Sequence, residues 1–365
     1  MDDLITRVND FARSADEPTR SKLVDVLRDL SISLERPEET RERIAYTLNA
    51  ARLARDLGLF ERLSTSASPV GLKTLATDTG ADVVLLGRVM RYLASVKMVD
   101  EPHVDTFTAN NVTRALSSPQ GNSYIDCFHE LVAPVFHRLP AFLARTNYAN
   151  PSNPCNVAMQ DAFGVEGDMW AFLKACPKYW EMFDRHMQMQ RDVLTDWGRI
   201  GEMISTRKNP RNDEVVFVDI GGGNGHECVR LQAACPGLVG RVILQDLPEV
   251  IGRALDIPGV ELMEFYYMRG VLHDFPDDKS RAILKNLAAA MGPDSVLLID
   301  EIVLPDKDVH WIAASIDMQM MSWLASGERT RRQWEALFES VGLSMVDVHA
   351  HRAGQYESLM VVRAM

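Results

Sequence analysis

The sequence of 365 residues lacks the features of secreted and membrane proteins. Its five cysteines are scattered, odd in number and include no CxxC pair, which argues against a disulfide framework and a cysteine-rich zinc site. No apolar run approaches the roughly 18 residues that a membrane span needs. The start, MDDLITRVNDF, does not look like a secretory signal. These absences favour a reducing, cytoplasmic setting without a membrane partner.

Positive charge is also scarce. The chain has 39 Lys and Arg against 51 Asp and Glu, a net charge of −12, which disfavours a broad surface for nucleic acid or anionic lipid. The composition, 46% hydrophobic and 25% charged, is that of a folded globular protein. At this length we expect two domains, or one large domain with a helical annex.

Residues 1–115 have helical periodicity and few strand signals. Acidic Glu38 and Glu39 follow Pro37, which favours a helix start, and apolar residues recur at helical spacing until Gly58. We expect this helix to bury one face against the rest of the front segment.

A winged-helix-like unit follows. Leu72–Ala76, the turn Thr79-Gly80, a helix over Asp82–Ser95 and a small hairpin with arms Met98-Val99 and Phe107-Thr108 have its order of elements. Winged helices often bind DNA, but the second helix offers only Arg88 and Arg91 in an acidic chain. A packing or dimerisation module is therefore the favoured interpretation.

The middle segment, residues 116–212, is rich in aromatic residues and methionines at helical spacing. Such a stripe is usually core, and the alternative is the wall of an apolar ligand pocket. Its members are Phe163, Trp170, Phe172, Tyr179, Trp180, Phe183, His186, Met187 and Met189.

From residue 213 to the end, short β-rich runs alternate with helices, which predicts an α/β domain with a parallel sheet covered on both faces. The expected strands are Val215–Ile220, Arg241–Gln245, Phe265–Val271 and Ser295–Ile299. The expected helices are Glu227–Ala234, Pro248–Leu255, Lys279–Ala290 and Gln333–Ser340. Two late runs, Ser344–His349 and Ser358–Val362, are expected to add an antiparallel hairpin at one edge.

The first strand leads into a glycine loop, in the sequence VVFVDIGGGNGHE. The strand ends near Asp219, and Gly221 and Gly223 allow a ligand to approach the backbone closely. The dinucleotide fingerprint would need its third glycine where His226 stands, so dinucleotide binding is not the first choice. Asp246 ends the next strand, where a carboxylate can accept hydrogen bonds from both hydroxyls of a ribose; the alternative is a helix cap.

His273 stands just after a strand, in VLHDFPDDK. A histidine at this edge is a candidate general base because its pKa lies near the working pH, and the alternative is a hydrogen-bonded structural residue. A metal site is disfavoured, since no second histidine stands at ligand spacing and the acids after Pro276 look like a helix start. Glu301 and Glu328 are each able to orient the imidazole, or to be solvated loop residues.

Five ordered motifs resemble a known family: VDIGGGNGHE, LQDLPEVI, YYMRGVLHDFPDDK, IDEIVLP and SGERT. They resemble the S-adenosylmethionine-dependent O-methyltransferases of the plant caffeic-acid type, in particular the fungal secondary-metabolism branch of the sterigmatocystin type. The front segments LARDLGLFERL and LLGRVMRYLASVKMVDE resemble the winged-helix dimerisation domain of that family. The resemblance covers nearly the whole chain.

The resemblance implies a homodimeric enzyme with three segments: a dimerisation domain over 1–115, a helical pocket segment over 116–212 and a Rossmann-like catalytic domain over 213–365. It places Asp219, Gly221, Gly223, Asp246 and Arg269 at the S-adenosyl-L-methionine site, with Asp246 on the ribose.

The same resemblance makes His273 the base that deprotonates the acceptor hydroxyl, with Glu301 and Glu328 on either side of it. Methyl transfer from a sulfonium is an in-line displacement, which needs no metal and no covalent intermediate. An apolar pocket would suit a flat phenolic or polyketide acceptor. The expected pocket residues are Trp170, Phe172, Phe183, His186, Met187, Met318, Met321 and Trp323.

One segment departs from the family. Parallel strands need a crossover of about a dozen residues, yet only Glu264 and Phe265 separate the runs Val260–Met263 and Tyr266–Val271. We therefore expect the edge strand to be lost or reduced, and the usual adenine-contacting carboxylate to be missing or replaced by Glu261 or Glu264. The shortening is either a missing piece of coding sequence or a real divergence.

A real divergence leaves two alternatives to methylation. The first is a pericyclic or dehydrating enzyme that uses the same pocket for positioning. The second is a non-catalytic winged-helix regulator, which the joint presence of His273, Glu301 and Glu328 disfavours.

Overall fold

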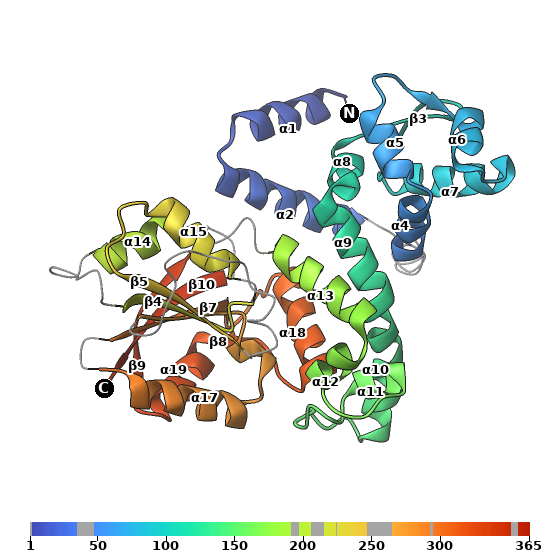
Figure 1. The fold of residues 1–365 in the computed structure, drawn as a ribbon. Helices are drawn as coiled ribbons and strands as arrows, with labels where there is room; N and C mark the ends of the chain where they lie inside the picture. The colour runs from blue at the N-terminus through green and yellow to red at the C-terminus, as the bar shows by residue number, and fades with distance from the viewer. Residues whose placement is uncertain are drawn as a thin grey trace. The chain divides into compact units, whose positions relative to one another are not determined.

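The computed structural model describes residues 2–34, 47–190, 197–205, 215–223, 225–246, 265–292, 295–351 and 357–365 (Figure 1). The chain forms two compact units. One comprises Met1–His137 and Leu173–Asp192, and the other Arg138–Phe172 and Val193–Met365. The middle segment thus contributes to both units, and the functional boundaries at 115 and 212 stay a prediction.

The first unit contains the expected winged helix. Asp82 caps the second helix by accepting hydrogen bonds from the backbone of Val84 and Leu85, while Gly80 ends the first in a left-handed conformation. The wing is an antiparallel sheet in the order β1-β3-β2. The elements are β1 (Val70–Gly71), α6 (Leu72–Thr79), α7 (Val83–Ser95), β2 (Asp100–His103) and β3 (Thr106–Thr108).

Other helices complete this unit, and its core includes the buried Phe60, Leu75, Met90 and Phe107. They are α1 (Asp2–Ser14), α2 (Glu17–Leu34), α4 (Thr47–Asp56), α5 (Leu59–Thr65), α8 (Asn111–Ser117), α9 (Pro119–Cys127), the π-helical η1 (Phe128–Val132) and α13 (Pro177–Gln190). The expected helix start at Glu38 and Glu39 lies outside the described residues.

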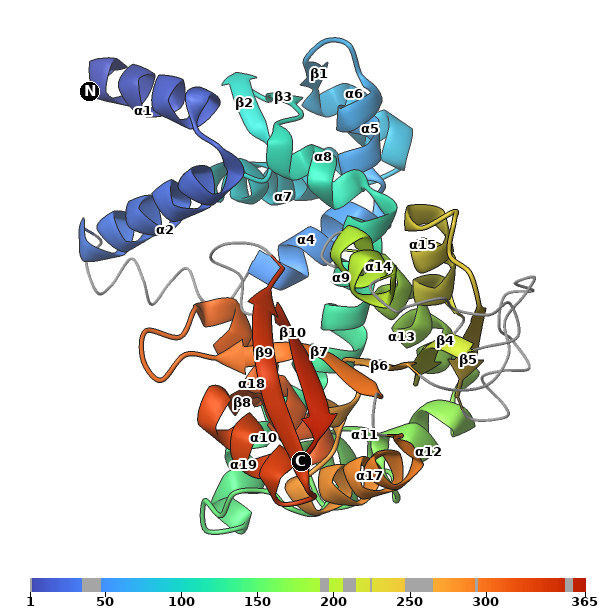
Figure 2. The ribbon, with the colours of Figure 1, turned by 90° about the vertical axis from the view of Figure 1, so that its left-hand side faces the viewer.

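The second unit is built on a mostly parallel sheet in the order β5-β4-β6-β7-β10-β9, with β8 paired to β7. β5, β4, β6 and β7 are parallel neighbours, whereas β10 and β9 form the expected antiparallel hairpin at one edge (Figure 2). The strands are β4 (Val215–Ile220), β5 (Arg241–Gln245), β6 (Phe265–Arg269), β7 (Val296–Leu304), β8 (Arg329–Thr330), β9 (Leu343–Ala350) and β10 (Glu357–Ala364).

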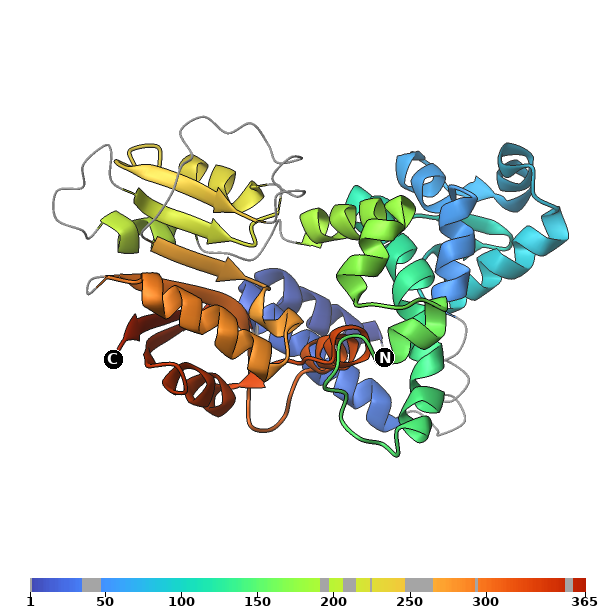
Figure 3. The same ribbon diagram turned by 60° about the horizontal axis from the view of Figure 1, so that its bottom comes forward.

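Helices cover both faces of this sheet, as predicted (Figures 1 and 3). α14 and α15 pack on one face around Phe217 and Tyr267, and α17 and α19 pack on the other around Met268 and Trp334. The remaining helices are α10 (Ala133–Arg145), α11 (Ala158–Phe163), α12 (Met169–Ala175), α14 (Trp197–Ser205), α15 (His226–Ala234), α17 (Asp277–Ala290), α18 (Trp311–Leu324) and α19 (Arg331–Glu339). No helix in the described part of the chain is long and apolar enough to cross a membrane.

Several predicted boundaries are corrected. In the first unit the hairpin begins with β2 at Asp100–His103 rather than at Met98-Val99. In the second unit α19 begins at Arg331 rather than Gln333, since Thr330 caps it. β6 ends at Arg269 rather than Val271 because Gly270 turns the chain with φ +56°. β7 continues to Leu304 because β10 and β8 extend its pairing, so Glu301 lies inside the strand rather than after it. α17 begins at Asp277, directly after Pro276.

Among the described residues, β5 is the edge strand of the sheet next to β4. The predicted helix Pro248–Leu255, the run Val260–Met263 and both candidate carboxylates, Glu261 and Glu264, lie outside the described residues. β6, the YYMR strand, lies between β4 and β7.

Candidate active site

The glycine loop follows β4 and is shaped by what lies beneath it. Gly221 and Gly223 have φ of +71° and +59°, a region that favours glycine. Gly222 is required by crowding instead, because a Cβ there would lie 2.3 Å from Oδ2 of Asp219. Asp219 is buried under the loop, 1% exposed. Its carboxylate therefore lies directly against the loop at Gly222.

Asp246 lies against the same loop. Its Oδ2 accepts a hydrogen bond from the backbone N–H of Gly223 at 2.8 Å, and the N–H of Gly221 donates to the carbonyl of Gln245 at 2.8 Å. No atom of the described residues lies within 4 Å of a Cβ built on Gly223, so this part of the structure leaves space in front of the loop. A carboxylate beside a glycine cradle with open space in front of it fits an adenosine-bearing cofactor.

Arg269 belongs to an internal charge network. Its Nη1 lies 3.0 Å from Oε1 of Glu227 at the start of α15, and its Nε lies 3.8 Å from Oδ2 of Asp300. The hydroxyl of Tyr267 donates to the same Asp300 oxygen at 2.7 Å. The guanidinium thus ties α15, which follows the glycine loop, to β6 and β7. Its contact with the cofactor stays a prediction.

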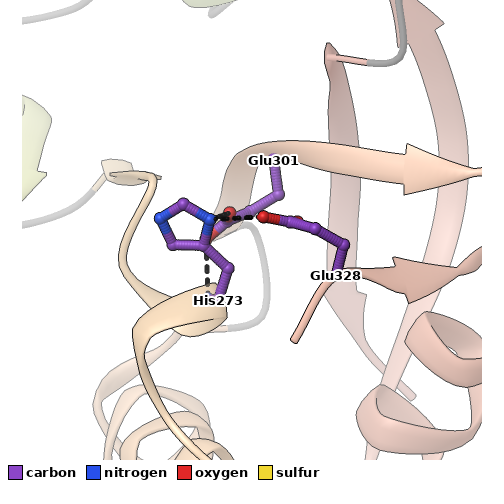
Figure 4. A group of neighbouring side chains, drawn as sticks. All are labelled: His273, Glu301 and Glu328. Atoms are coloured by element: carbon purple, nitrogen blue, oxygen red, sulfur yellow. Dashed lines mark hydrogen bonds and ion pairs between the residues drawn. The ribbon is translucent and has the colours of Figure 1, made fainter. Parts of the chain in front are cut away.

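The structure brings His273, Glu301 and Glu328 together (Figure 4). His273 lies on a 3₁₀ turn, η3 (Leu272–Asp274), and its Nδ1 is 2.8 Å from Oε1 of Glu328 and 3.8 Å from Oε2 of Glu301. The imidazole side chain is 20% exposed, against 1% and 0% for the two glutamates. The imidazole is therefore partly accessible, whereas the two carboxylates next to it are buried.

Glu301 holds the backbone of the turn as well as facing the ring. Its Oε1 accepts hydrogen bonds from the N–H groups of Val271 at 2.9 Å and Leu272 at 2.8 Å. The other oxygen of Glu301, like Oε2 of Glu328, is buried without a hydrogen-bond partner in the described part of the chain. Both oxygens are available to stabilise positive charge on the imidazole.

The acidic surroundings decide the charge of His273. Burial alone would lower its pKa, but the nearby charges of Glu301, Glu328 and Asp274 and the hydrogen bond to Glu328 raise the pKa well above its usual value. Burial raises the pKa of Glu301 to about 7, against the opposing effect of His273. A ring that gains a proton here is strongly stabilised.

Sequence reasoning missed two residues that hold Glu328. The backbone N–H of Glu328 donates to Oδ1 of Asp317 on α18 at 2.8 Å. Gly327 permits this approach, since a Cβ there would lie 2.7 Å from the same oxygen. The glycine of SGERT was a usable signal, whereas Asp317 lies inside an apolar helix and carries none.

The same three side chains are also able to hold a metal ion. One ligand atom from each of His273, Glu301 and Glu328 lies within 4.8 Å of the others. The prediction of no metal is not tested by this geometry.

The predicted pocket residues fall into two groups. In the second unit, Phe172 is buried and stacks on Phe163 with ring centroids 4.7 Å apart, and Trp323 lies 5.9 Å from Phe163. Trp170 and Met321 are half-buried and Met318 is exposed in the same unit. In the first unit, His186 is buried beside Tyr124 and Phe128, and Phe183 and Met187 are half-buried. Their role in a common pocket stays a prediction.

Comparisons with known families agree with the geometry. The O-methyltransferase domain matches residues 153–344, and the O-methyltransferase dimerisation domain matches residues 45–118. The chain belongs to the O-methyltransferase family. The helical front is accordingly its dimerisation domain and the α/β unit carries its methyltransferase domain, as the sequence predicted.

The relatives are fungal. O-methyltransferase ucdC of Aspergillus ustus is 46% identical over 377 residues, with 99% of each chain covered. Demethylsterigmatocystin 6-O-methyltransferase of Aspergillus flavus is 31% identical, over 99% of this chain and 98% of its own, which confirms the predicted branch. The first alignment is longer than this chain, so ucdC has residues without a counterpart here.

Solved structures match equally well. LepI in complex with S-adenosylmethionine has a TM-score of 0.91 at 33% identity, over 99% of this chain and 98% of its own. A structure described as a pericyclic reaction enzyme has a TM-score of 0.90 at the same identity and coverage. The protein is an enzyme of the S-adenosylmethionine-dependent O-methyltransferase family.

Proposed function

We propose that this protein transfers the methyl group of S-adenosyl-L-methionine to a hydroxyl of an apolar aromatic or polyketide-type metabolite, with His273 as general base. The observation that carries this proposal is the arrangement of His273, whose Nδ1 is held by Glu328 at 2.8 Å while part of the ring stays exposed. A base needs one nitrogen fixed and the other accessible.

When bound, the cofactor supplies an electrophilic methyl group on a sulfonium. The residues that would hold it are the glycine loop over Asp219 and, on its ribose, Asp246. Arg269 keeps the start of α15 in place beside that loop through Glu227. These residues hold the cofactor in position, and the proton transfer takes place at His273.

The imidazole of His273 receives the proton of the substrate hydroxyl. Nδ1 is hydrogen-bonded to Glu328, so the proton of the substrate hydroxyl is taken up by Nε2. Nε2 lies 3.5 Å from Oδ1 of Asp274. The two buried glutamates then stabilise the imidazolium that forms. Because these glutamates also raise the pKa of the resting ring, the neutral base is most abundant in alkaline solution.

The acceptor class follows from the aromatic and methionine side chains proposed for the pocket. Within the second unit, Trp170, Phe172, Met318, Met321 and Trp323 suit a flat apolar ring system. The dimerisation domain supports a homodimer as the working form, and we place its activity in the cytoplasm, without nucleic-acid or membrane partners.

The proposal is tested with methyl-labelled S-adenosylmethionine and a panel of phenolic polyketides. We expect label in an O-methylated product with the wild-type protein and none with His273→Ala. Equal labelling by this variant would reject His273 as the base.

A second function is favoured by one pair of observations. A structural relative at 33% identity is described as a pericyclic reaction enzyme, and the raised pKa of His273 suits a hydrogen-bond donor as well as a base. In that case a polyketide-type substrate is converted in the presence of labelled S-adenosylmethionine while the product stays unlabelled. Label in the product excludes this function.

A further inference from the structure

The backbone carbonyls around His273 are held by two neighbouring side chains. Nη1 of Arg329 donates to the carbonyl of Leu272 at 3.0 Å, and Nη2 donates to the carbonyl of Phe275 at 2.9 Å. The hydroxyl of Ser326 donates to the carbonyl of His273 itself at 2.5 Å. Three carbonyls of one short turn are thus fixed from the segment that also carries Glu328.

The guanidinium of Arg329 binds both this turn and the start of the helix that follows it. It is 5% exposed, donates to Oδ1 of Asp277 at 2.9 Å and to Oγ of Ser280 at 3.3 Å, and lies 5.0 Å from the ring centroid of Trp334. All four acceptors lie between residues 272 and 280. The rigid fork of a guanidinium suits several acceptors at fixed angles, which a lysine does not reproduce.

The N–H groups at the start of the turn are held by a different side chain. Glu301 accepts from Val271 and Leu272, so a carboxylate fixes the donors of the turn while a guanidinium fixes its acceptors. Charge-assisted hydrogen bonds of this kind are about twice as strong as neutral ones. A small movement of η3 would break several of them at once.

We infer that Arg329 is a positioning residue, whose guanidinium fixes the turn that carries His273 and thereby keeps the imidazole against Glu328 and Glu301. The effect of Arg329 on catalysis rests on the proposed function, whereas its effect on the position and titration of His273 does not. Glu328 and Arg329 are adjacent in the chain. One segment therefore provides both the carboxylate that contacts the imidazole and the guanidinium that binds the backbone of the same turn.

The first test follows His273 directly by NMR in the intact protein. Histidine-labelled protein contains nine histidines, and the signal that disappears in His273→Asn belongs to His273. In Arg329→Lys we expect this signal to titrate at lower pH than in the wild type, because a loosened turn weakens the contact with both carboxylates. A purely stabilising role for Arg329 would leave the titration of the folded variant unchanged.

The second test uses the methyl-transfer assay. We expect Arg329→Lys to lower kcat roughly tenfold or more, as displacement of a general base does, with little change in the KM for S-adenosylmethionine. Arg332→Lys is the matched control, since Arg332 lies three residues further on, in α19, with its side chain 84% exposed, and it should behave as the wild type in both tests.

The two readouts separate the two hypotheses. A shifted titration without any methyl transfer by the wild type would support the positioning role and reject the proposed function. An unshifted titration with normal kcat in folded Arg329→Lys would overturn the positioning role. Should Arg329→Lys not fold, Ser326→Ala removes only the hydroxyl that donates to the His273 carbonyl, and the same titration then decides.

Discussion

Nδ1 of His273 lies 2.8 Å from Oε1 of Glu328, a carboxylate whose side chain is wholly buried. The pairing fixes which ring nitrogen faces the acceptor and stabilises the protonated ring. It also joins two segments that are 55 residues apart in the sequence.

Replacing His273 should remove catalysis without removing the cofactor. In His273→Asn we expect turnover to fall about 10²- to 10⁴-fold, as the loss of a general base does, while the affinity for S-adenosylhomocysteine stays the same. Methyl-transfer assays and calorimetry measure the two quantities. His103→Asn, an exposed histidine of the first unit, is the control; normal turnover in His273→Asn would contradict the assignment.

The pH dependence of the rate should reveal the two acids. Because Glu301 and Glu328 raise the pKa of His273, kcat/KM should increase with pH through neutrality and level off once the ring is neutral. Glu328→Gln removes one negative charge and lowers that pKa, so the rising limb should move to lower pH. The plateau should also fall, since the ring loses part of its orientation. A limb that stays in place would show that Glu328 does not set the charge of the ring.

Gly222 should tolerate no side chain. A Cβ at this position would lie 2.3 Å from Asp219 and 2.6 Å from Leu244, so Gly222→Ala should lower the free energy of unfolding by about 1–3 kcal/mol and weaken the binding of S-adenosylhomocysteine. Gly237→Ala is the control, because a Cβ there meets no described residue within 4 Å. Thermal denaturation and calorimetry give the comparison; equal stability of the two variants would mean that the loop adapts.

Asp246 should contribute to cofactor affinity through its charge. Asp246→Asn retains an acceptor for the N–H of Gly223 but weakens hydrogen bonds to ribose hydroxyls. Hydrogen bonds to a charged group contribute about 1.5–3 kcal/mol, so we expect a loss of roughly ten- to a hundredfold in affinity for S-adenosylhomocysteine. Asp278→Asn, exposed on α17, should bind as the wild type does. Unchanged affinity in Asp246→Asn would favour a helix-cap role instead.

Much of the α/β unit could be predicted because its signals are local. The strands Val215–Ile220 and Arg241–Gln245 are short apolar runs bounded by polar residues, and their observed limits are those predicted. The end of β7 was missed because it depends on pairing with β10 and β8, which are distant in the sequence. That pairing places Glu301 within a strand and directs it at the turn of His273.

The candidate site was predictable only where a residue type signals its chemistry. His273 and Glu328 belong to motifs with acid and base groups, so they could be selected from the sequence. Arg329 and Asp317 act on backbone groups through contacts that the sequence does not encode locally. Ion pairs such as Arg269 with Glu227 are likewise a result of the fold.

The central claim is that the glycine loop and Asp246 form a working cofactor site although the chain is short between β5 and β6. Calorimetric titration of the intact protein with S-adenosylhomocysteine tests this claim most directly. We predict saturable binding at micromolar affinity or better, with one ligand for each chain. A folded protein that shows no binding would contradict the claim, and with it the assignment of methyl transfer.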